Sequence, residues 1–316
     1  LASVASTLGK SLDECERLLT QARRKLMTER DKRIRPGRDE KILTSWNALM
    51  IEGMARAASI FGRRDWLNSA RRALDFLRAT MWQEDEGSGE GGRLLATCKN
   101  GHAHLNAYLD DYAFLLNALI ELMQADFRVA DLEFAEALAE VLLERFEDPQ
   151  AGGFFFTSHD HERLIHRAKP GYDNATPAGN GVAAFALQRL AHLTGEQRYQ
   201  NAAERTLQLF YPQMVRHPVG YATLLMALEE FLQPPRTIIL RGPQQQVEDW
   251  RARLAQEPLL QTLILAVGEQ RTGLPPVLDK PLSDTVNAWA CCGVKCLAPI
   301  ADFAELQRVC KSAELL

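Results

Sequence analysis

Apolar residues recur at steps of three and four over most of the first three quarters of the chain, which is the spacing of one face of an α-helix. Ser11 and Glu14 have the spacing of a capping box, so a helix is expected to run on from Leu12. Three apolar stripes follow: Leu43, Trp46, Met50, Met54, Ala57 and Phe61, which Gly62 can cap; Trp66, Ala70, Ala73, Leu77 and Met81; and Leu105, Leu109, Tyr112, Leu116, Leu119, Met123 and Phe127. Further helices are expected near residues 131–147, 177–194, 197–214 and 219–232.

The stripe that starts at Leu105 has a second apolar face, formed by Phe114, Leu115 and Leu122. A helix on the surface needs only one apolar stripe, so this pattern predicts an inner, largely buried helix. About eight helices follow one another as hairpins, without the fixed short period of a solenoid. We therefore predict a mainly α fold, an incomplete (α/α) helical-hairpin toroid whose inner helices surround a cavity.

Two long loops interrupt the helices, at 85–101 and 148–176. The second contains GGFFFT and RLIHRAK, which predict a short two-stranded excursion. After Pro234-Pro235 the pattern changes to a small α/β segment. Its expected strands are Thr237–Leu240, Leu263–Val267 and Ala288–Cys291, and its expected helices are Gln244–Ala255 and Phe303–Cys310. The predicted domains are therefore a toroid at 1–233 and an α/β segment at 236–316.

The charge balance excludes several classes of function. Lys and Arg number 37 against 41 Asp and Glu, so the net charge is −4 and there is no electrostatic footprint for nucleic acid or an anionic membrane.

The opening LASVASTLGK lacks the features of a signal peptide, and six cysteines in so long a chain are not a secreted disulfide framework. We expect a cytoplasmic protein. No phosphate-binding or nucleophile-elbow motif occurs, and we expect no cofactor.

Five segments carry a resemblance to a known family: DEKILTSWNALM at 39–50, LDDYAFLLNALIEL at 109–122, GGFFFT at 152–157, HRAKPGYDNATPAGN at 166–180 and CCGVKCLAP at 291–299. In their order and content they resemble the C-terminal half of the thioredoxin-domain family that includes spermatogenesis-associated protein 20. The resemblance implies a six-hairpin toroid like that of N-acylglucosamine 2-epimerases and some glycosidases. It also implies that a thioredoxin-like domain and the first hairpins are missing here.

This chain departs from the family pattern at several positions. Ala48 stands where the family has Gly after Trp-Asn, and Asn174 replaces the Gly of Asp-Gly-Ala. Ala178 and Gly181 replace the two serines of Pro-Ser-Gly-Asn-Ser, so two hydroxyls are absent from a loop expected near the cavity. Proposals that use those hydroxyls as donors or nucleophiles are weakened.

Asp110 and Asp111 lie at the start of the predicted inner helix. Toroid glycosidases use carboxylates at such places, and a neighbouring carboxylate raises a pKa toward the range of a general acid. We predict Asp111 and Asp173 as catalytic, with Asp110 and Tyr112 as substrate-binding. The structural alternative is that these carboxylates only complement the helix macrodipole.

Other polar residues are expected to line the cavity. Trp46 can stack on a sugar face and Asn47 can bond vicinal hydroxyls, although Trp46 also fits a core stripe. Arg167, Lys169 and Asn180 precede or start a predicted helix, where two cations can hold an anionic group or pair with Asp173 or Asp111. All five are predicted to bind substrate.

Cysteines and histidines suggest less. Cys291 and Cys296 match the family's late Cys-x4-Cys, which makes a redox pair one option and inert thiols the default. His159-x-His161 has the spacing of a metal pair, but no third ligand is evident, so no metal site is predicted.

Two functions remain open. The first is a carbohydrate-active or carbohydrate-binding toroid, which would cleave a glycoside or isomerise a sugar if catalytic and would bind a small saccharide or sugar acid. The alternative is a non-enzymatic scaffold or redox platform for a thioredoxin-like module.

Overall fold

The computed structural model describes residues 1–84, 92–259, 261–293 and 295–312. The chain divides into two compact units, Leu1–Glu40 and Lys41–Leu316. The first contains α1 (Ala2–Thr7) and α2 (Leu12–Asp31). The expected cap of α2 is present, because the Ser11 hydroxyl accepts a hydrogen bond from the Glu14 backbone N–H at 3.1 Å. The division near residue 40 was not anticipated from the sequence, and the boundary between 233 and 236 stays a prediction.

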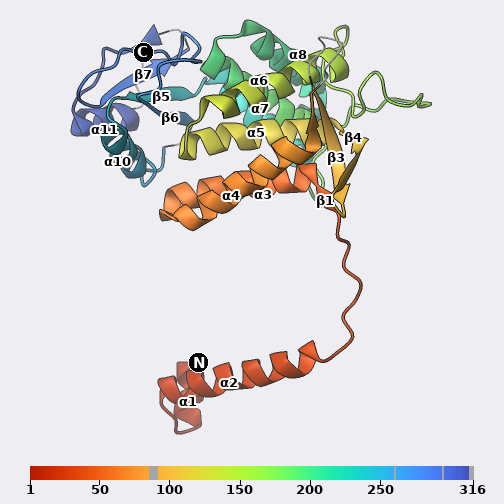
Figure 1. The fold of residues 1–316 in the computed structure, drawn as a ribbon, viewed down its shortest axis with the longest axis vertical. Helices are drawn as coiled ribbons and strands as arrows, with labels where there is room; N and C mark the ends of the chain where they lie inside the picture. Colours follow the sequence, from red (N-terminus) through yellow and green to blue (C-terminus); the bar gives the residue numbers. More distant parts are fainter. Residues whose placement is uncertain (85–91, 260, 294, 313–316) are drawn as a thin grey trace. The chain divides into compact units, whose positions relative to one another are not determined.

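The second unit is built on seven helices arranged as hairpins (Figure 1): α3 (Thr44–Phe61), α4 (Arg64–Phe76), α5 (Leu109–Ala125), α6 (Val129–Val141), α7 (Gly179–Thr194), α8 (Gln197–Arg216) and α9 (Ala222–Leu232). Helices α3, α5, α7 and α9 pack side by side in that order and form an inner layer. Helices α4, α6 and α8 pack outside α3, α5 and α7 respectively. The predicted class, a mainly α helical-hairpin toroid that is incomplete, is confirmed.

Helix α5 lies between α3 and α7 and is buried on nearly all sides, as its two apolar faces predict. The prediction of which face of α3 is buried was wrong. Its buried side is Thr44, Ala48, Ile51, Ala55 and Ala58, whereas Trp46, Met50 and Phe61 of the predicted stripe are exposed. Small side chains let α3 approach α5 closely. The stabilisation from this close packing outweighs what burial of the larger apolar residues on the other face would give.

A small sheet lies where the chain enters α3 and α5 (Figure 1). Strand β3 (Arg93–Lys99) pairs antiparallel with three short strands: β1 (Ile42–Leu43), β2 (Trp82–Gln83) and β4 (His102–Asn106). Five-residue π-helical turns close α4 and α6, at Leu77–Met81 and Leu142–Phe146.

The predicted two-stranded excursion at 148–176 is misplaced. The backbone there takes part in one isolated bridge, between Glu147 and Phe154, and the hairpin that the structure forms is β3–β4. Leu105 lies in that hairpin rather than in the helix.

The C-terminal segment is the predicted βαβ unit. Strands β5 (Arg236–Arg241) and β6 (Thr262–Gly268) are parallel and are joined by α10 (Gln244–Leu254). Strand β7 (Asn287–Cys292) pairs antiparallel with β5, β8 (Lys295–Cys296) pairs with β7, and α11 (Phe303–Lys311) follows. One sheet face packs on α10 and α11 through Ile238 and Leu240, and the other joins the helical core through Ile239 and Trp289. The small C-terminal α/β segment is confirmed.

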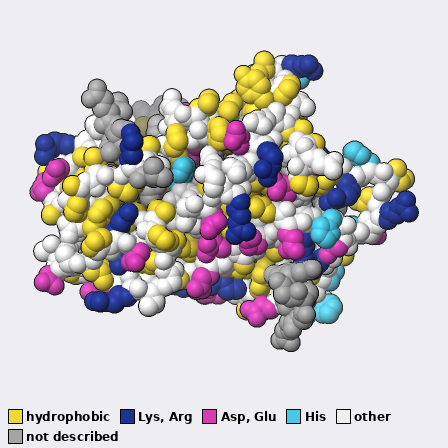
Figure 2. Space-filling model, turned by 90° about the horizontal axis from the view of Figure 1, so that it is seen from above, with side chains coloured by type: hydrophobic (Ala, Val, Ile, Leu, Met, Phe, Trp, Pro, Cys, Tyr) yellow, Lys and Arg dark blue, Asp and Glu magenta, His cyan; other side chains and the backbone are white. Residues whose placement is uncertain are grey.

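Charges of both signs are interspersed on the face drawn in Figure 2, in agreement with the near-balanced composition. In the described part of the chain, we find no helix with the length and apolar character that crossing a bilayer requires.

Candidate functional site

Carboxylates tie together the N-terminal ends of the inner helices. Asp111, in the first turn of α5, accepts a hydrogen bond from the Ser45 backbone N–H through Oδ1 and one from the Tyr108 backbone N–H through Oδ2, both at 2.9 Å. Ser45 is the second residue of α3, and Tyr108 is the N-cap of α5. One buried side chain thus caps two helices at once. Burial raises the pKa of Asp111, and the hydrogen bonds oppose that rise.

Asp173 plays the same part for the next two inner helices. Its Oδ1 accepts from the backbone N–H of Ala178, the N-cap of α7, and its Oδ2 accepts from the N–H of Thr223 in the first turn of α9, both at 2.8 Å. Both predicted catalytic carboxylates therefore use all their oxygens on backbone donors. A role in proton transfer would require one of these caps to open.

Asp110 differs from its neighbour. Its side chain is partly exposed, but Oδ1 is buried and accepts no hydrogen bond from the described residues. Burial and the adjacent Asp111 charge raise the pKa of Asp110 to about 6; the Gly179 backbone N–H, which lies close but makes no well-aligned hydrogen bond with Oδ1, opposes that rise. A Cβ at position 179 would collide with Asp110 Oδ1 and with Leu109, so glycine there lets α7 start this close without a shift of either side chain. A carboxyl group that titrates near pH 6 suits a general acid.

Trp46 lies one residue beyond Ser45 and leaves 65% of its surface exposed. Asn47 donates its amide to the Leu43 carbonyl at 2.8 Å, so its oxygen remains to accept from a ligand. Tyr112 is buried, and its hydroxyl oxygen accepts from the Leu94 backbone N–H at 2.8 Å. Burial raises the pKa of Tyr112 to about 12, so this tyrosine holds β3 against α5 as a neutral phenol.

The loop before α7 is fixed by the other predicted residues. Asn180 is fully buried and bonds both backbone groups of Phe154 and the carbonyl of Pro170, at 2.7–2.9 Å. Arg167 donates to the Thr157 carbonyl at 2.6 Å and stacks on Phe155. These contacts replace the strand pairing that the sequence predicted for the loop.

Lys169 donates to Asp148 Oδ2 at 2.8 Å and to the Gly152 carbonyl at 3.0 Å. The Lys169 hydrogen bond, aided by backbone donors, lowers the pKa of Asp148 to about 2. The pairing of Arg167 or Lys169 with Asp173 or Asp111, which the sequence left open as an alternative to anion binding, is not found among the described side chains.

The structure thus gathers Trp46, Asp110, Asp111, Asp173 and Asn180 at the N-terminal ends of the inner helices. Arg167 and Lys169 serve the adjoining loop. Cys291 and Cys296 lie apart from them on β7 and β8, where they form a disulfide. No cluster of metal-ligating side chains is found in the residues that the structure describes.

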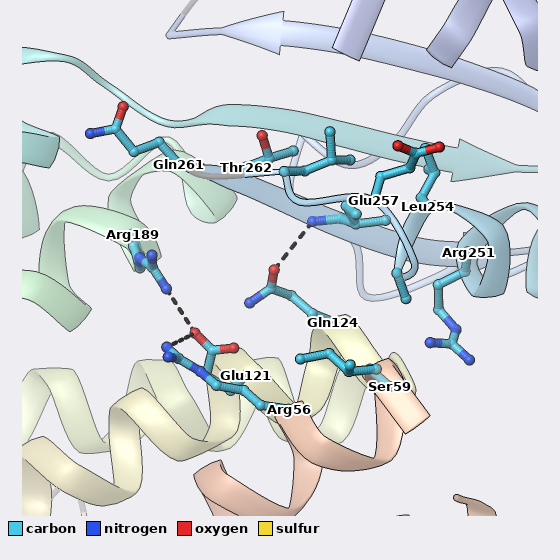
Figure 3. A pocket seen from close by; sticks show the side chains of 14 residues that line it. Arg56, Ser59, Glu121, Gln124, Arg189, Arg251, Leu254, Glu257, Gln261 and Thr262 are labelled. Atoms are coloured by element: carbon cyan, nitrogen blue, oxygen red, sulfur yellow. Dashed lines mark hydrogen bonds and ion pairs between the residues drawn. The ribbon is translucent and has the colours of Figure 1, made fainter. Parts of the chain in front are cut away.

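A charged cluster that was not predicted from the sequence lies at the opposite ends of the same helices. Arg56, Glu121, Arg189 and Glu230 come from α3, α5, α7 and α9 and form a continuous ion-pair network, of which Figure 3 shows the part from Arg56 to Arg189. The signal was available in the sequence, since Glu121 interrupts LLNALIELM and Arg189 interrupts AFALQRLAHL. A charged residue inside an otherwise apolar helix needs a buried partner.

The fold and its capped inner helices define the class of protein as an incomplete helical-hairpin toroid with an α/β extension. No family model matches the chain. It is 31% identical to human spermatogenesis-associated protein 20 over 327 residues, with 98% of this chain and 41% of that protein covered. The rat protein of that name is 28% identical, with 95% and 40% covered. The resemblance to this family is confirmed, and the chain spans about two fifths of the length of the curated relatives it matches.

Solved structures with a partial likeness include the alpha-1,6-mannanase of a Salegentibacter species, at 17% identity and a TM-score of 0.43, covering 54% of this chain and 47% of that one. The cellobiose 2-epimerase of Bacillus thermoamylovorans has a TM-score of 0.44 at 13% identity, covering 56% and 46%. Identities and scores this low assign neither a site nor a substrate to the chain.

Proposed function

We propose that this chain binds a carbohydrate at the N-terminal ends of its inner helices, between the Trp46 indole and the Asp110 carboxyl group. The observation that carries the proposal is Asp110: a partly exposed carboxyl group with one unbonded buried oxygen and a pKa near 6. The Asp111–Ser45 hydrogen bond ties its neighbour to the start of α3, one residue from Trp46. An acid and a flat apolar surface are thus offered at one end of the helix layer.

An exposed indole is a natural platform for a sugar. The C–H face of a pyranose packs on an aromatic ring, while its hydroxyl groups need donors and acceptors at the ring's edge. Asn47 offers a carbonyl oxygen there, and Asp110 offers a hydroxyl donor when protonated and two acceptor oxygens when ionised. This set of groups fits a neutral saccharide better than an ion.

If the bound sugar reacts, Asp110 is the proposed acid. Protonated Asp110 would donate its proton to the glycosidic oxygen as the bond from that oxygen to the glycosidic carbon breaks. The oxygen of a water molecule would then bond to that carbon, and the water would return a proton to the Asp110 carboxylate. A retaining or inverting glycosidase needs a second carboxylate, and the nearest in sequence is Asp111. Both Asp111 oxygens accept the hydrogen bonds that cap helices, which leaves neither free for catalysis. We therefore propose binding as the main function, and cleavage or isomerisation only as an extension of it.

The test is a binding titration with a panel of mannooligosaccharides, cellobiose, amino sugars and sugar acids, followed by calorimetry on Trp46→Ala. Loss of one stacking surface should weaken binding by about tenfold or more. Tyr211→Ala is the matched control, because Tyr211 is a comparably exposed aromatic residue on the outer helix α8. If no saccharide binds at millimolar concentration, or if both variants bind like the parent chain, the proposal is wrong.

A second candidate is the redox platform for a thioredoxin-like module, and the Cys291–Cys296 disulfide favours it. Cys296 is exposed at the hairpin and Cys291 is buried, so an incoming thiolate would attack the Cys296 sulfur and release Cys291 as the thiolate. The Lys280 ammonium lies 3.7 Å from Cys296 Sγ and would attract the attacking anion. A second thiol of the module would then resolve the mixed disulfide, which leaves this chain reduced and the module oxidised.

Thiol counting after incubation with a reduced thioredoxin discriminates this candidate from the first. The platform predicts that two thiols per chain appear at Cys291 and Cys296 and that Lys280→Gln slows their appearance. Saccharide binding should not change. A disulfide that survives the incubation would remove this candidate and leave the carbohydrate proposal intact.

A further inference from the structure

A cavity of about 520 Å³ lies beside the Cys291–Cys296 disulfide. One wall is the turn that joins α7 to α8, and the other comes from the C-terminal α/β segment. None of the residues proposed for the carbohydrate site lines it. The volume is within the range of small-molecule pockets, so the cavity can accommodate a compound of tripeptide size.

The two sulfur atoms of the disulfide are unequally accessible. Cys296 is exposed and lines the cavity, whereas Cys291 is buried against the helical core. Thiol–disulfide exchange begins when a thiolate attacks one sulfur and expels the other. A thiolate that enters the cavity therefore attacks Cys296 Sγ and expels Cys291.

Lys280 places a cation next to the attacked sulfur. Its Nζ lies 3.7 Å from Cys296 Sγ and forms no ion pair with a carboxylate of the described residues. The negative charge is shared among three sulfur atoms while they exchange, so an ammonium group at this distance stabilises the transition state. The cavity as a whole is balanced in charge, because Glu196 also lines it, 3.5 Å from Arg198, and burial lowers the pKa of His192. The attraction is therefore local to the sulfur.

The wall formed by α8 carries an unused hydrogen-bond acceptor. Gln200 Oε1 is buried and accepts no hydrogen bond from the described residues. Buried amide oxygens usually have a donor, so a ligand with an N–H group would complete this wall. Gln197 adds a second amide, and apolar surface comes from Ala191, Pro276 and Val277. Amide and apolar groups around a reactive sulfur fit a thiol of peptide character better than a simple alkyl thiol.

We propose that this cavity binds a small peptide thiol with the size and chemistry of glutathione, which becomes attached to Cys296. The ligand thiolate bonds to Cys296 Sγ, the bond between Cys291 and Cys296 breaks, and Cys291 leaves as a thiolate that takes up the proton lost by the ligand thiol. The products are one mixed disulfide and one thiol, so this step needs no further oxidant or reductant. The inference shares the disulfide with the redox platform proposed above, but it needs no protein partner and does not rest on the carbohydrate site.

The experiment measures the initial rate of disulfide opening in the full chain, by acid quench and mass spectrometry, with glutathione and with 3-mercaptopropionate. The two thiolates carry the same net charge, and their rates are compared at equal thiolate concentration. We expect the rate to saturate with glutathione and to stay proportional to concentration with 3-mercaptopropionate. Proportional rates for both thiols overturn the site. The incubation with reduced thioredoxin tests the platform separately, so either proposal can fail while the other stands.

Two variants test the cavity and the cation. Gln197→Trp fills the cavity from the first turn of α8, so it should abolish saturation and lower the glutathione rate to that of 3-mercaptopropionate. Gln208→Trp is the control, because Gln208 is an exposed glutamine of the same helix that bonds only Glu204. Lys280→Gln should slow both thiols by about fivefold, and Lys295→Gln, on β8, should not. A folded Gln197→Trp chain that saturates like the parent contradicts the assignment.

Cys291→Ser identifies the attached residue, because it removes the thiol that would expel the ligand again. In this chain the Cys296 thiolate would attack one sulfur of oxidised glutathione, and glutathione would leave. Peptide mapping should then find a single glutathione, on Cys296. Attachment to Cys292 or Cys310 instead would assign the chemistry to another thiol and overturn the inference.

Discussion

The Asp111 carboxylate accepts a hydrogen bond from the Ser45 backbone N–H at 2.9 Å, so a side chain in the first turn of α5 caps the start of α3. The same carboxylate caps its own helix through Tyr108. Residues 66 positions apart in sequence are thereby held at the site where Trp46 emerges.

Asp111→Ala should destabilise the fold, because it leaves two buried helix-end donors without partners. Each lost cap costs about 1–2 kcal/mol, so the free energy of unfolding should fall by roughly 2–4 kcal/mol. Urea denaturation measures the change, with the exposed Asp75→Ala on α4 as control, for which a change below about 0.5 kcal/mol is expected. If the Asp111→Ala chain were as stable to unfolding as the parent chain, the two caps would not contribute to stability.

Asp110→Asn should stabilise the chain at neutral and alkaline pH. The folded-state pKa, about 6, exceeds the ordinary value of 3.8, so the contribution of Asp110 to stability is full below pH 4 and is lost as the pH rises through 6. The neutral amide removes that loss. We expect a gain of about 2 kcal/mol at pH 8 that disappears near pH 4.

The measurement is urea denaturation of both chains between pH 4 and pH 8. A gain that is independent of pH would mean that Asp110 does not titrate in this range. A loss at every pH would mean that its carboxylate form is the stabilising one.

Arg189→Met should be strongly destabilising, because it leaves Glu230 and part of the Glu121 charge buried without their partner. A loss of about 3–5 kcal/mol is expected. Adding Glu230→Gln to the same chain should restore part of the loss, since the stranded charge is then removed. The control is Arg198→Met, which breaks a largely exposed pair with Glu140 and should cost about 1 kcal/mol or less. Chemical denaturation of the parent chain and the three variants measures these changes. The network would be refuted if the double variant were no more stable to unfolding than Arg189→Met alone.

Lys169→Met should weaken the loop before α7 in a pH-dependent way. The pKa of Asp148 is lowered to about 2, so the stability that this pair supplies is present above pH 4 and is lost as the pH falls toward 2. We expect a difference of about 1 kcal/mol at pH 7 that shrinks as the pH is lowered to 3. Limited proteolysis of the loop at the two pH values reports the local change, and equal cleavage of both chains at pH 7 would exclude the pair as an anchor.

The fold followed from the sequence wherever periodicity reflects burial. The two apolar faces of α5 predicted its central place, and the change of pattern after Pro235 predicted the βαβ unit. The stripe through Trp46 misled because the small residues Ala48 and Ala55 of α3 determine which face packs. Periodicity counts apolar positions and does not register that a small side chain allows a closer approach.

The candidate site followed only in part. The motifs of the sequence pointed to residues at the N-terminal ends of the inner helices, where Asp111, Asp173 and Asn180 lie. The sequence did not show that their oxygens accept from backbone donors, because all of those donors except Tyr108 are 5 to 66 residues away and depend on the fold. For the same reason it favoured Asp111 over Asp110, whose pKa depends on burial against α7.

The most direct test of the carbohydrate site uses the chain labelled with 5-fluorotryptophan. Five tryptophans give five fluorine resonances, and Trp46→Phe identifies one of them. On titration with a saccharide that binds, the site at the N-terminal ends of the inner helices predicts that the Trp46 resonance alone shifts and saturates. If that resonance stays in place while a buried tryptophan such as Trp289 moves, the sugar binds elsewhere and the proposed site is wrong.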